Sequence, residues 1–340
     1  MHPFLAACLR RPTGFTPVWL MRQAGRFLPE YRAIRSRLSF LELCKHPEAA
    51  AEVTLLPVER LRVDAAILFA DILLIVEPMG VGLEFARGEG PVIHRPVRSA
   101  EDVERLVERD PAETVPFVFE TVRRVRAALA ERVPLIGFAG APFTVASYLV
   151  EGGASRDYLE TKRLMYRDPG AWHALLARLA RTIARYLNGQ IAAGAQAVQL
   201  FDSWVGALGP DDYREYVLRH TRAVIQALTP GVPVIHFGTG TAGLLPALRE
   251  AGGDVIGLDW RVDLDEAWAR VGHDVAVQGN LDPAALLAPP DEIRRRVRAI
   301  LARAGGRPGH VFNLGHGVLP ETPVDHAVAM VDAVHELSAR

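Results

Sequence analysis

Two arginines four residues apart, Arg22 and Arg26, are the side chains whose chemistry is easiest to read from this sequence. Guanidinium groups keep their charge at any working pH and bind carboxylate or phosphate oxygens through paired hydrogen bonds. An apolar run at 17–21 precedes them, and Gly25 lies between them. This arrangement favours a site for a ligand with several negative charges. The alternative is a solvated loop or helix start, which an arbitrary pair of arginines would indicate.

Three further polar residues follow apolar runs. Asp71 ends the run at 64–71, Ser203 ends the run at 195–203, and His316 lies between two glycines. Asp71 and Ser203 are equally typical of helix caps. The glycines beside His316 favour a site, because they allow backbone and ligand to approach closely. Other polar residues at comparable positions are His236, Asp259, Asn280 and Asp282.

Tyr148 lies in a helix-like segment, five residues after Phe143. An aromatic residue in such a segment is more typical of core packing than of chemistry. The pair Gly152 and Gly153 that follows indicates a tight turn, which a ligand site would also accommodate. Both interpretations of Tyr148 stay open.

The elements that must position these residues alternate between buried strands and amphipathic helices. Continuous apolar runs bounded by turn residues are typical of strands buried on both faces of a parallel sheet. The runs lie at 17–21, 64–71, 134–140, 195–203, 233–238, 254–259, 275–280 and 310–316. Eight such strands predict an α/β fold of the (β/α)8 TIM-barrel type, as a single domain over residues 1–340. The carboxyl ends of barrel strands build the site, so the polar residues above are expected to converge there.

The intervening segments carry helical patterns. Helices are predicted at 40–62, 171–193, 211–228, 242–251, 291–304 and 324–338. The stretch 81–97 predicts a β-hairpin after the second strand, because it is rich in turn residues. The glycines concerned are Gly80, Gly82, Gly88 and Gly90.

Composition excludes several classes of function. The 340 residues are 49% hydrophobic and carry a net charge of −1, which gives no reason to expect nucleic acid or an anionic membrane as a partner. Cys8 and Cys44 form neither a zinc spacing nor a disulfide framework. No signal peptide, membrane span, phosphate loop or serine-hydrolase elbow is recognisable, so we expect a cytoplasmic protein.

Taken together, the motifs resemble those of the uroporphyrinogen decarboxylase family. The matching stretches are 17–32 (PVWLMRQAGRFLPEYR), 67–72 (ILFADI), 137–153 (GFAGAPFTVASYLVEGG), 201–203 (FDS) and 313–320 (NLGHGVLP). They span nearly the whole chain in the family's order. The resemblance implies a distorted (β/α)8 barrel, usually a homodimer. It also implies removal of CO2 from the four acetates of uroporphyrinogen III, giving coproporphyrinogen III in heme biosynthesis without cofactor or metal.

The resemblance also implies roles for individual residues. Asp71, Arg22 and Tyr148 are the expected catalytic residues, with Asp71 stabilising a protonated pyrrole. The expected substrate-binding residues are Arg22, Gln23, Ala24, Gly25, Arg26, Ile67, Phe69, Asp71, Phe138, Tyr148, Phe201, Ser203 and His316. Paired arginines suit a substrate with eight carboxylates.

Two other interpretations are compatible with such a barrel. One is a zinc-dependent barrel methyltransferase, which would need a late His-x-Cys motif. Here His236 is followed by Phe237 and Gly238, and no cysteine lies beyond Cys44. The other is an inactive tetrapyrrole-binding relative, but a mere binder would have no need of a carboxylate such as Asp71.

Overall fold

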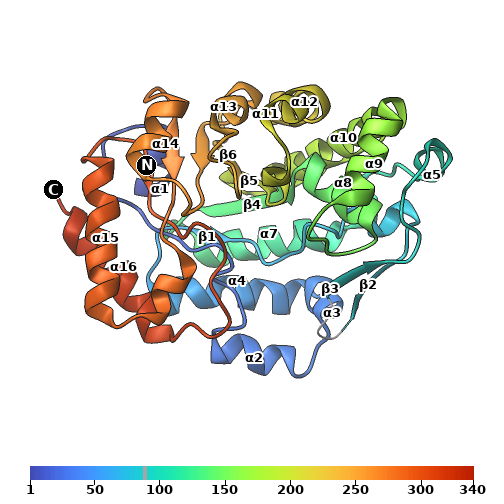
Figure 1. Ribbon diagram of the computed structural model, residues 1–340. Coiled ribbons are helices and arrows are strands. Elements are labelled where there is room, and N and C mark those ends of the chain that lie inside the picture. Colours follow the sequence, from blue (N-terminus) through green and yellow to red (C-terminus); the bar gives the residue numbers. More distant parts are fainter. Residues whose placement is uncertain (87–89) are drawn as a thin grey trace.

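Seven parallel strands form a curved sheet at the centre of the structure (Figure 1). The computed structural model describes residues 1–86 and 90–340. The sheet order is β1-β4-β5-β6-β7-β8-β9. The strands are β1 Ala66–Ile67, β4 Leu135–Gly140, β5 Ala197–Asp202, β6 Val234–Gly238, β7 Val255–Gly257, β8 Ala276–Gln278 and β9 His310–Val311. Every residue of β4 and β6 is buried, which confirms the prediction of strands covered on both faces.

Residues 17–19 close the ring between the last strand and the first. The backbone N–H of Phe312 donates to the carbonyl of Pro17 at 2.8 Å, and that of Trp19 donates to Phe312 at 3.3 Å. On the other side, the N–H of Asp64 donates to the carbonyl of Val18 at 2.8 Å. The structure is therefore a distorted (β/α)8 barrel in which the eighth position is a single parallel bridge.

The strand predicted at 17–21 is wrong in extent. Only Val18 forms a β-bridge, to Phe312. The next N–H groups bond to side chains: Leu20 to Gln23 at 3.0 Å and Met21 to Asn313 at 3.0 Å. The predicted strands at 64–71 and 310–316 likewise shrink to β1 and β9, since the residues beyond them enter loops.

Helices surround the sheet, with α4 beside α7 and α15 beside α16 (Figure 1). Those before β4 are α1 Pro3–Cys8, α2 Pro29–Arg35, α3 Phe40–Cys44, α4 Pro47–Leu61, α5 Ala100–Arg105, α6 Pro111–Thr114 and α7 Pro116–Leu129. The others are α8 Pro142–Glu151, α9 Leu159–Arg167, α10 Pro169–Ala193, α11 Pro210–Tyr216, α12 Leu218–Gln226, α13 Leu245–Ala251, α14 Leu264–Val271, α15 Pro290–Ala304 and α16 Val324–Ser338. Many begin with proline, whose fixed φ and missing N–H suit the first helical position.

Two predicted helices are each divided in the structure. The segment 40–62 forms α3 and α4, because Pro47 starts a new helix with His46 as its N-cap. Pro57, which the sequence marks as a breaker, lies inside α4 without ending it. The segment 211–228 forms α11 and α12, which meet at Val217.

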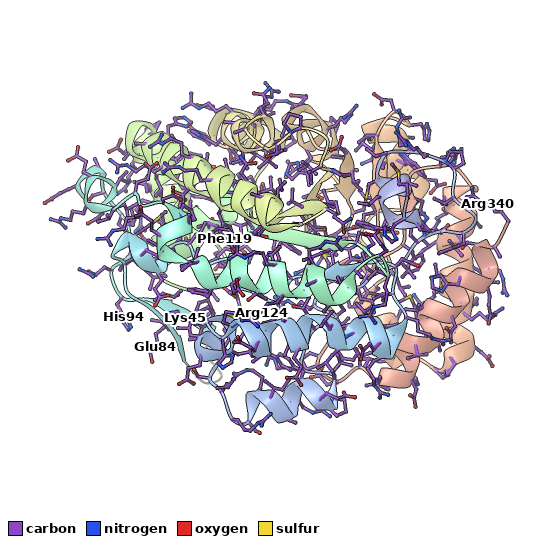
Figure 2. The ribbon with its side chains drawn as sticks, turned by 180° about the vertical axis from the view of Figure 1, so that it is seen from behind. Lys45, Glu84, His94, Phe119, Arg124 and Arg340 are labelled. Carbon is purple, nitrogen blue, oxygen red and sulfur yellow. The ribbon has the colours of Figure 1, made fainter. Side chains whose placement is uncertain are left out.

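The predicted hairpin is confirmed. Strands β2 Leu83–Ala86 and β3 Gly90–Ile93 pair antiparallel. Across them, Oε2 of Glu84 and Nε2 of His94 are 3.2 Å apart, and Figure 2 shows the two side chains at the same edge of the molecule. Gly88, one of the glycines used for the prediction, lies outside the described residues.

The barrel interior contains a chain of buried polar side chains. Nε1 of Trp19 donates to Oε1 of Gln278 at 2.9 Å, and Nε2 of Gln278 donates to Oε1 of Gln199 at 3.0 Å. All three residues are almost fully buried. Since a buried amide costs free energy unless it is hydrogen-bonded, this chain requires residues 17–21, β5 and β8 to keep one relative position.

Candidate active site

The turn that carries Arg22 is held from beneath by a buried amide. Oε1 of Gln23 accepts from the N–H of Leu20 at 3.0 Å, and its Nε2 donates to the carbonyl of Ala65 at 3.1 Å. Gln23 is fully buried, whereas Arg22 is exposed and has a left-handed φ of 60°. The side chain of Gln23 therefore faces the core. Only its backbone is left for the substrate contact expected from the sequence.

Ala24, Gly25 and Arg26 continue this turn toward solvent. A Cβ on Gly25 would lie 2.5 Å from the carbonyl oxygen of Arg22, so the tight turn requires glycine. Ala24 and Gly25 are half-buried, and Arg26 is exposed. Both guanidinium groups thus lie on the solvent side of a turn whose other side is fixed in the core.

Asp71 lies just beyond β1 and is half-buried. Its Oδ1 accepts from the N–H of Leu73 at 2.8 Å, which closes a local turn and not a helix N-terminus, since the next helix along the chain is the short 3-10 helix η1 Glu77–Met79. No other side-chain hydrogen bond of Asp71 exists among the described residues, so Oδ2 is left for a ligand. Burial raises the pKa of Asp71 to about 6, against the opposing effects of the Leu73 N–H and the charge of Arg22.

Tyr148, on α8, belongs to the same electrostatic environment. Burial and the charge of Asp71 raise the pKa of Tyr148 to about 12, while Arg22 acts in the opposite direction. The centroid of its ring lies 3.8 Å from that of Trp204, and the ring of Tyr158 lies 5.2 Å from the same indole. Tyr148 is half-buried rather than part of the core. The sequence offered no signal for Trp204 or Tyr158.

His316 lies on the loop after β9, and this loop packs against Arg22. A Cβ on Gly317 would come within 2.3 Å of Cδ of Arg22, so these two segments are in direct contact. Burial and the charges of Arg22 and Arg261 lower the pKa of His316 to about 4, with a smaller opposing effect of Asp259. The imidazole is therefore neutral at pH 7 and can both donate and accept a hydrogen bond.

The aromatic and aliphatic residues expected at the site lie on or just beyond β1, β4 and β5. The rings of Phe138 and Phe201 meet edge to face at 5.4 Å, and Phe201 contacts Phe237 at 5.8 Å. Ile67 ends β1 and is buried, as is Phe69 just beyond it, whose ring packs against Tyr31 and Phe40 at 5.8 and 5.9 Å. Apolar side chains of this kind suit the flat part of a macrocycle.

Ser203 lies at the end of β5, half-buried. Its carbonyl accepts a hydrogen bond from Oγ1 of Thr239. Its hydroxyl forms no hydrogen bond among the described residues, so the structure shows no helix cap there and leaves the hydroxyl for a ligand.

The other polar residues at strand ends have structural roles. His236 belongs to β6 and is fully buried, against α13 and Gly253. The side-chain amide of Asn280 donates to the carbonyls of Asp259 and Val262, at 3.0 and 2.7 Å. Asp282 caps the following turn through the N–H of Ala284. Arg22 thus acts on the pKa values of Asp71, Tyr148 and His316, whereas His236, Asn280 and Asp282 have local packing or hydrogen-bonding roles.

Among the described residues, 1–86 and 90–340, no group of three or more His, Cys, Asp or Glu side chains is arranged so that it could hold a metal ion. Over the same ranges, none of the helices combines the length and apolar character that a membrane span requires.

Comparison with known proteins identifies close relatives. The family model described as Uroporphyrinogen decarboxylase (URO-D) matches residues 1–337. The uroporphyrinogen decarboxylase of Sorangium cellulosum is 60% identical over 339 residues, covering 99% of this chain and 97% of that protein. That of Carboxydothermus hydrogenoformans is 59% identical over 337 residues, covering 99% and 96%.

Solved structures share the fold. A methyltransferase from Methanosarcina mazei superposes with a TM-score of 0.84 at 20% identity, covering 98% of this chain and 97% of that one. At this identity the likeness concerns the fold alone, and it gives no support to the methyltransferase alternative.

The contact between Gly317 and Arg22 yields a prediction. In Gly317→Ala the added Cβ would lie 2.3 Å from Cδ and 2.7 Å from Cγ of Arg22, so the arginine must move. We expect affinity for the octacarboxylate uroporphyrin, measured by fluorescence titration, to fall by about tenfold. Gly243→Ala is the control, because nothing lies within 4 Å of its added Cβ. Unchanged affinity in a folded Gly317→Ala protein would show that Arg22 does not bind the ligand.

Proposed function

Because the chain belongs to the uroporphyrinogen decarboxylase family, we propose that it converts uroporphyrinogen III to coproporphyrinogen III by removing CO2 from four acetate side chains. It is thus a carboxy-lyase of porphyrin and heme biosynthesis. The observation that carries the proposal is identity of 59–60% to named decarboxylases over almost the whole of both chains. The barrel mouth, with one carboxylate, exposed arginines and aromatic side chains, supports it.

The proposed chemistry uses the pyrrole ring as its own electron sink. A proton adds to a ring carbon next to the acetate-bearing position, which leaves positive charge on the ring nitrogen. The bond to the carboxylate then breaks, CO2 leaves, and its electron pair neutralises the ring. A second proton adds to the exocyclic methylene, and loss of the first proton restores the pyrrole with a methyl group.

In this proposal, Asp71 stabilises the cationic ring. Its Oδ2 accepts hydrogen bonds from pyrrole N–H groups, and its negative charge is most effective in a sheltered site. Oδ1 is already fixed by the N–H of Leu73, so the carboxylate needs little reorganisation.

The remaining residues bind the substrate's carboxylates and macrocycle. Arg22 and Arg26 clamp acetate and propionate groups through charge-assisted hydrogen bonds. Tyr148, Ser203 and neutral His316 add hydrogen bonds from other strands. Ile67, Phe69, Phe138 and Phe201 contact the pyrrole faces, with Gln23, Ala24 and Gly25 lining the site through their backbone. No cofactor or metal is needed, because the ring itself accepts the electrons.

Two further proposals rest on the family resemblance. The protein acts in the cytoplasm on a small-molecule substrate, and it forms a homodimer. Sedimentation equilibrium at micromolar concentration should give twice the chain mass of 37.2 kDa, and a single-chain mass would contradict the dimer.

The central experiment follows the reaction itself. Purified protein is incubated anaerobically with uroporphyrinogen III, without metal or cofactor, and oxidised products are separated by carboxyl number. We expect seven-, six- and five-carboxyl intermediates that converge on coproporphyrin. Asp71→Asn should lose at least a hundredfold in rate, because the cation loses its counter-charge.

The matched control is Asp332→Asn, which removes a carboxylate on α16 that is paired with Arg62, before the amino end of β1 and so at the other end of that strand from Asp71. Tight binding without turnover by the wild type would favour the inactive tetrapyrrole-binding relative. Full activity of Asp71→Asn would leave the reaction intact and refute the role of the carboxylate.

The raised pKa of Asp71 predicts a pH profile. Since the ionised carboxylate is required, kcat/KM should fall as pH drops through about 6, the folded-state pKa of Asp71. Arg22→Gln should move this limb to higher pH, because the charge of Arg22 lowers that pKa. Titration of the substrate's own carboxyls is common to both proteins and cancels in the difference. An unmoved limb would contradict the coupling.

The same pKa change has a consequence for stability. Between pH 3.8, the ordinary pKa, and about 6, the native carboxyl holds its proton more tightly than the unfolded one. The contribution of Asp71 to the free energy of unfolding therefore decreases as pH rises through this window. Above about pH 6, where the reaction needs the ionised carboxylate, burial of Asp71 thus lowers the free energy of unfolding.

A further inference from the structure

The loops after β5, β6, β7 and β9 contact one another at the barrel mouth. The hydroxyl of Thr239, after β6, donates to the carbonyl of Ser203, after β5. The N–H of Gly240 donates to Oδ2 of Asp259, after β7, at 2.7 Å. A Cβ on Gly315, after β9, would lie 2.5 Å from the backbone nitrogen of Trp260. The loop after β7 therefore lies directly against the loop that carries His316.

Arg261, in this loop, is an arginine whose orientation is fixed before any ligand binds. Its Nη1 donates to Oδ2 of Asp259 at 2.5 Å, and its backbone N–H donates to Oδ1 at 3.1 Å. On the other side, its guanidinium lies over the ring of Trp260, 4.1 Å from the centroid. These contacts remove much of the conformational freedom that a long side chain otherwise loses on binding a ligand.

The guanidinium still has donors to offer. The Arg261 side chain keeps 52% of its surface exposed, whereas that of Asp259 keeps 1%. Within residues 1–86 and 90–340, no hydrogen bond engages Nε or Nη2 of Arg261. A simple charge-neutralising partner for Asp259 would not need this exposed fork, since the carboxylate already accepts two backbone N–H groups.

The charge of Arg261 reaches His316 but not the centre of the proposed chemistry. Both Arg22 and Arg261 lower the pKa of His316, so two positive charges act on the imidazole. Arg22 also acts on Asp71 and Tyr148, whereas Arg261 is not among the groups that shift the pKa of either residue. Because Arg261 follows Trp260, which lies against Gly315, Arg261 lies in the loop beside His316.

We propose that Arg261 is a specificity-determining residue that binds a carboxylate of a pyrrole ring other than the one being decarboxylated, together with His316. This inference rests on the proposed function. A carboxylate at this position receives two N–H groups from Arg261 and one from neutral His316. Trp260 and Asp259 hold the fork in place for it. The interaction orients the macrocycle and retains partly decarboxylated intermediates.

The test compares Arg261→Gln with wild type and with Arg294→Gln, which removes an exposed arginine paired with Glu336 on the outer helices. We expect Arg261→Gln to raise KM for uroporphyrinogen by about tenfold and to weaken uroporphyrin binding equally, from loss of charge-assisted bonds. The kcat of the first decarboxylation should change less than threefold. Released seven-, six- and five-carboxyl intermediates should increase. Arg294→Gln should match the wild type.

A conservative variant separates binding from structure. Arg261→Lys keeps the charge but not the fork and should recover part of the affinity. If Arg261 only neutralises Asp259, Arg261→Gln will lower the unfolding temperature and reduce kcat for every intermediate alike, with unchanged uroporphyrin affinity. That result, or wild-type KM and product distribution, would overturn the inference. An inactive wild type that binds uroporphyrin would instead overturn the proposed function, and the affinity of Arg261→Gln would still test this residue.

Discussion

The backbone seam at residues 17–23 is the constraint on which the rest of the structure depends. Its peptide groups close the barrel between Phe312 and Asp64, and the side chains of Gln23 and Asn313 satisfy the next N–H groups. A buried donor without a partner would cost about 1–3 kcal/mol, so each bond restricts the path of the chain. The same segment that completes the fold therefore delivers Arg22 to the mouth with little freedom.

The carboxylate of Asp64 holds residues 17–23 at the point where they enter the barrel. Oδ2 of Asp64 accepts from the N–H of Val18 at 2.7 Å and lies 2.8 Å from Nε2 of His335 on α16. Residues 17–23 are thus held by the segment before β1, by the segment after β9 and by α16. The hydrogen bonds that close the barrel also fix the backbone that carries Arg22. A change that weakens them would therefore affect both the stability of the barrel and the geometry of the site.

Charge at the mouth is balanced by burial. Desolvation raises the pKa of Asp71, and Arg22 limits the rise, so the carboxylate stays ionised at pH 7 while remaining sheltered. Burial and the charges of Arg22 and Arg261 lower the pKa of His316, so its imidazole is neutral at pH 7. Gly315 and Gly317 let the loop of His316 lie directly against Trp260 and Arg22, which brings these charged and polar groups close together.

The sequence by itself predicted the parallel barrel and the candidate members of the site. Buried apolar runs predict parallel strands, and the strand-end positions of Asp71, Ser203 and His316 place them at one mouth, because parallel strands share their carboxyl ends. Only the tertiary structure decided the extent of each strand, the burial of the Gln23 side chain, and the place of Trp204 and Arg261 beside the site. These depend on contacts between loops distant in sequence, and on which polar groups find buried partners. No local pattern of residues encodes such contacts.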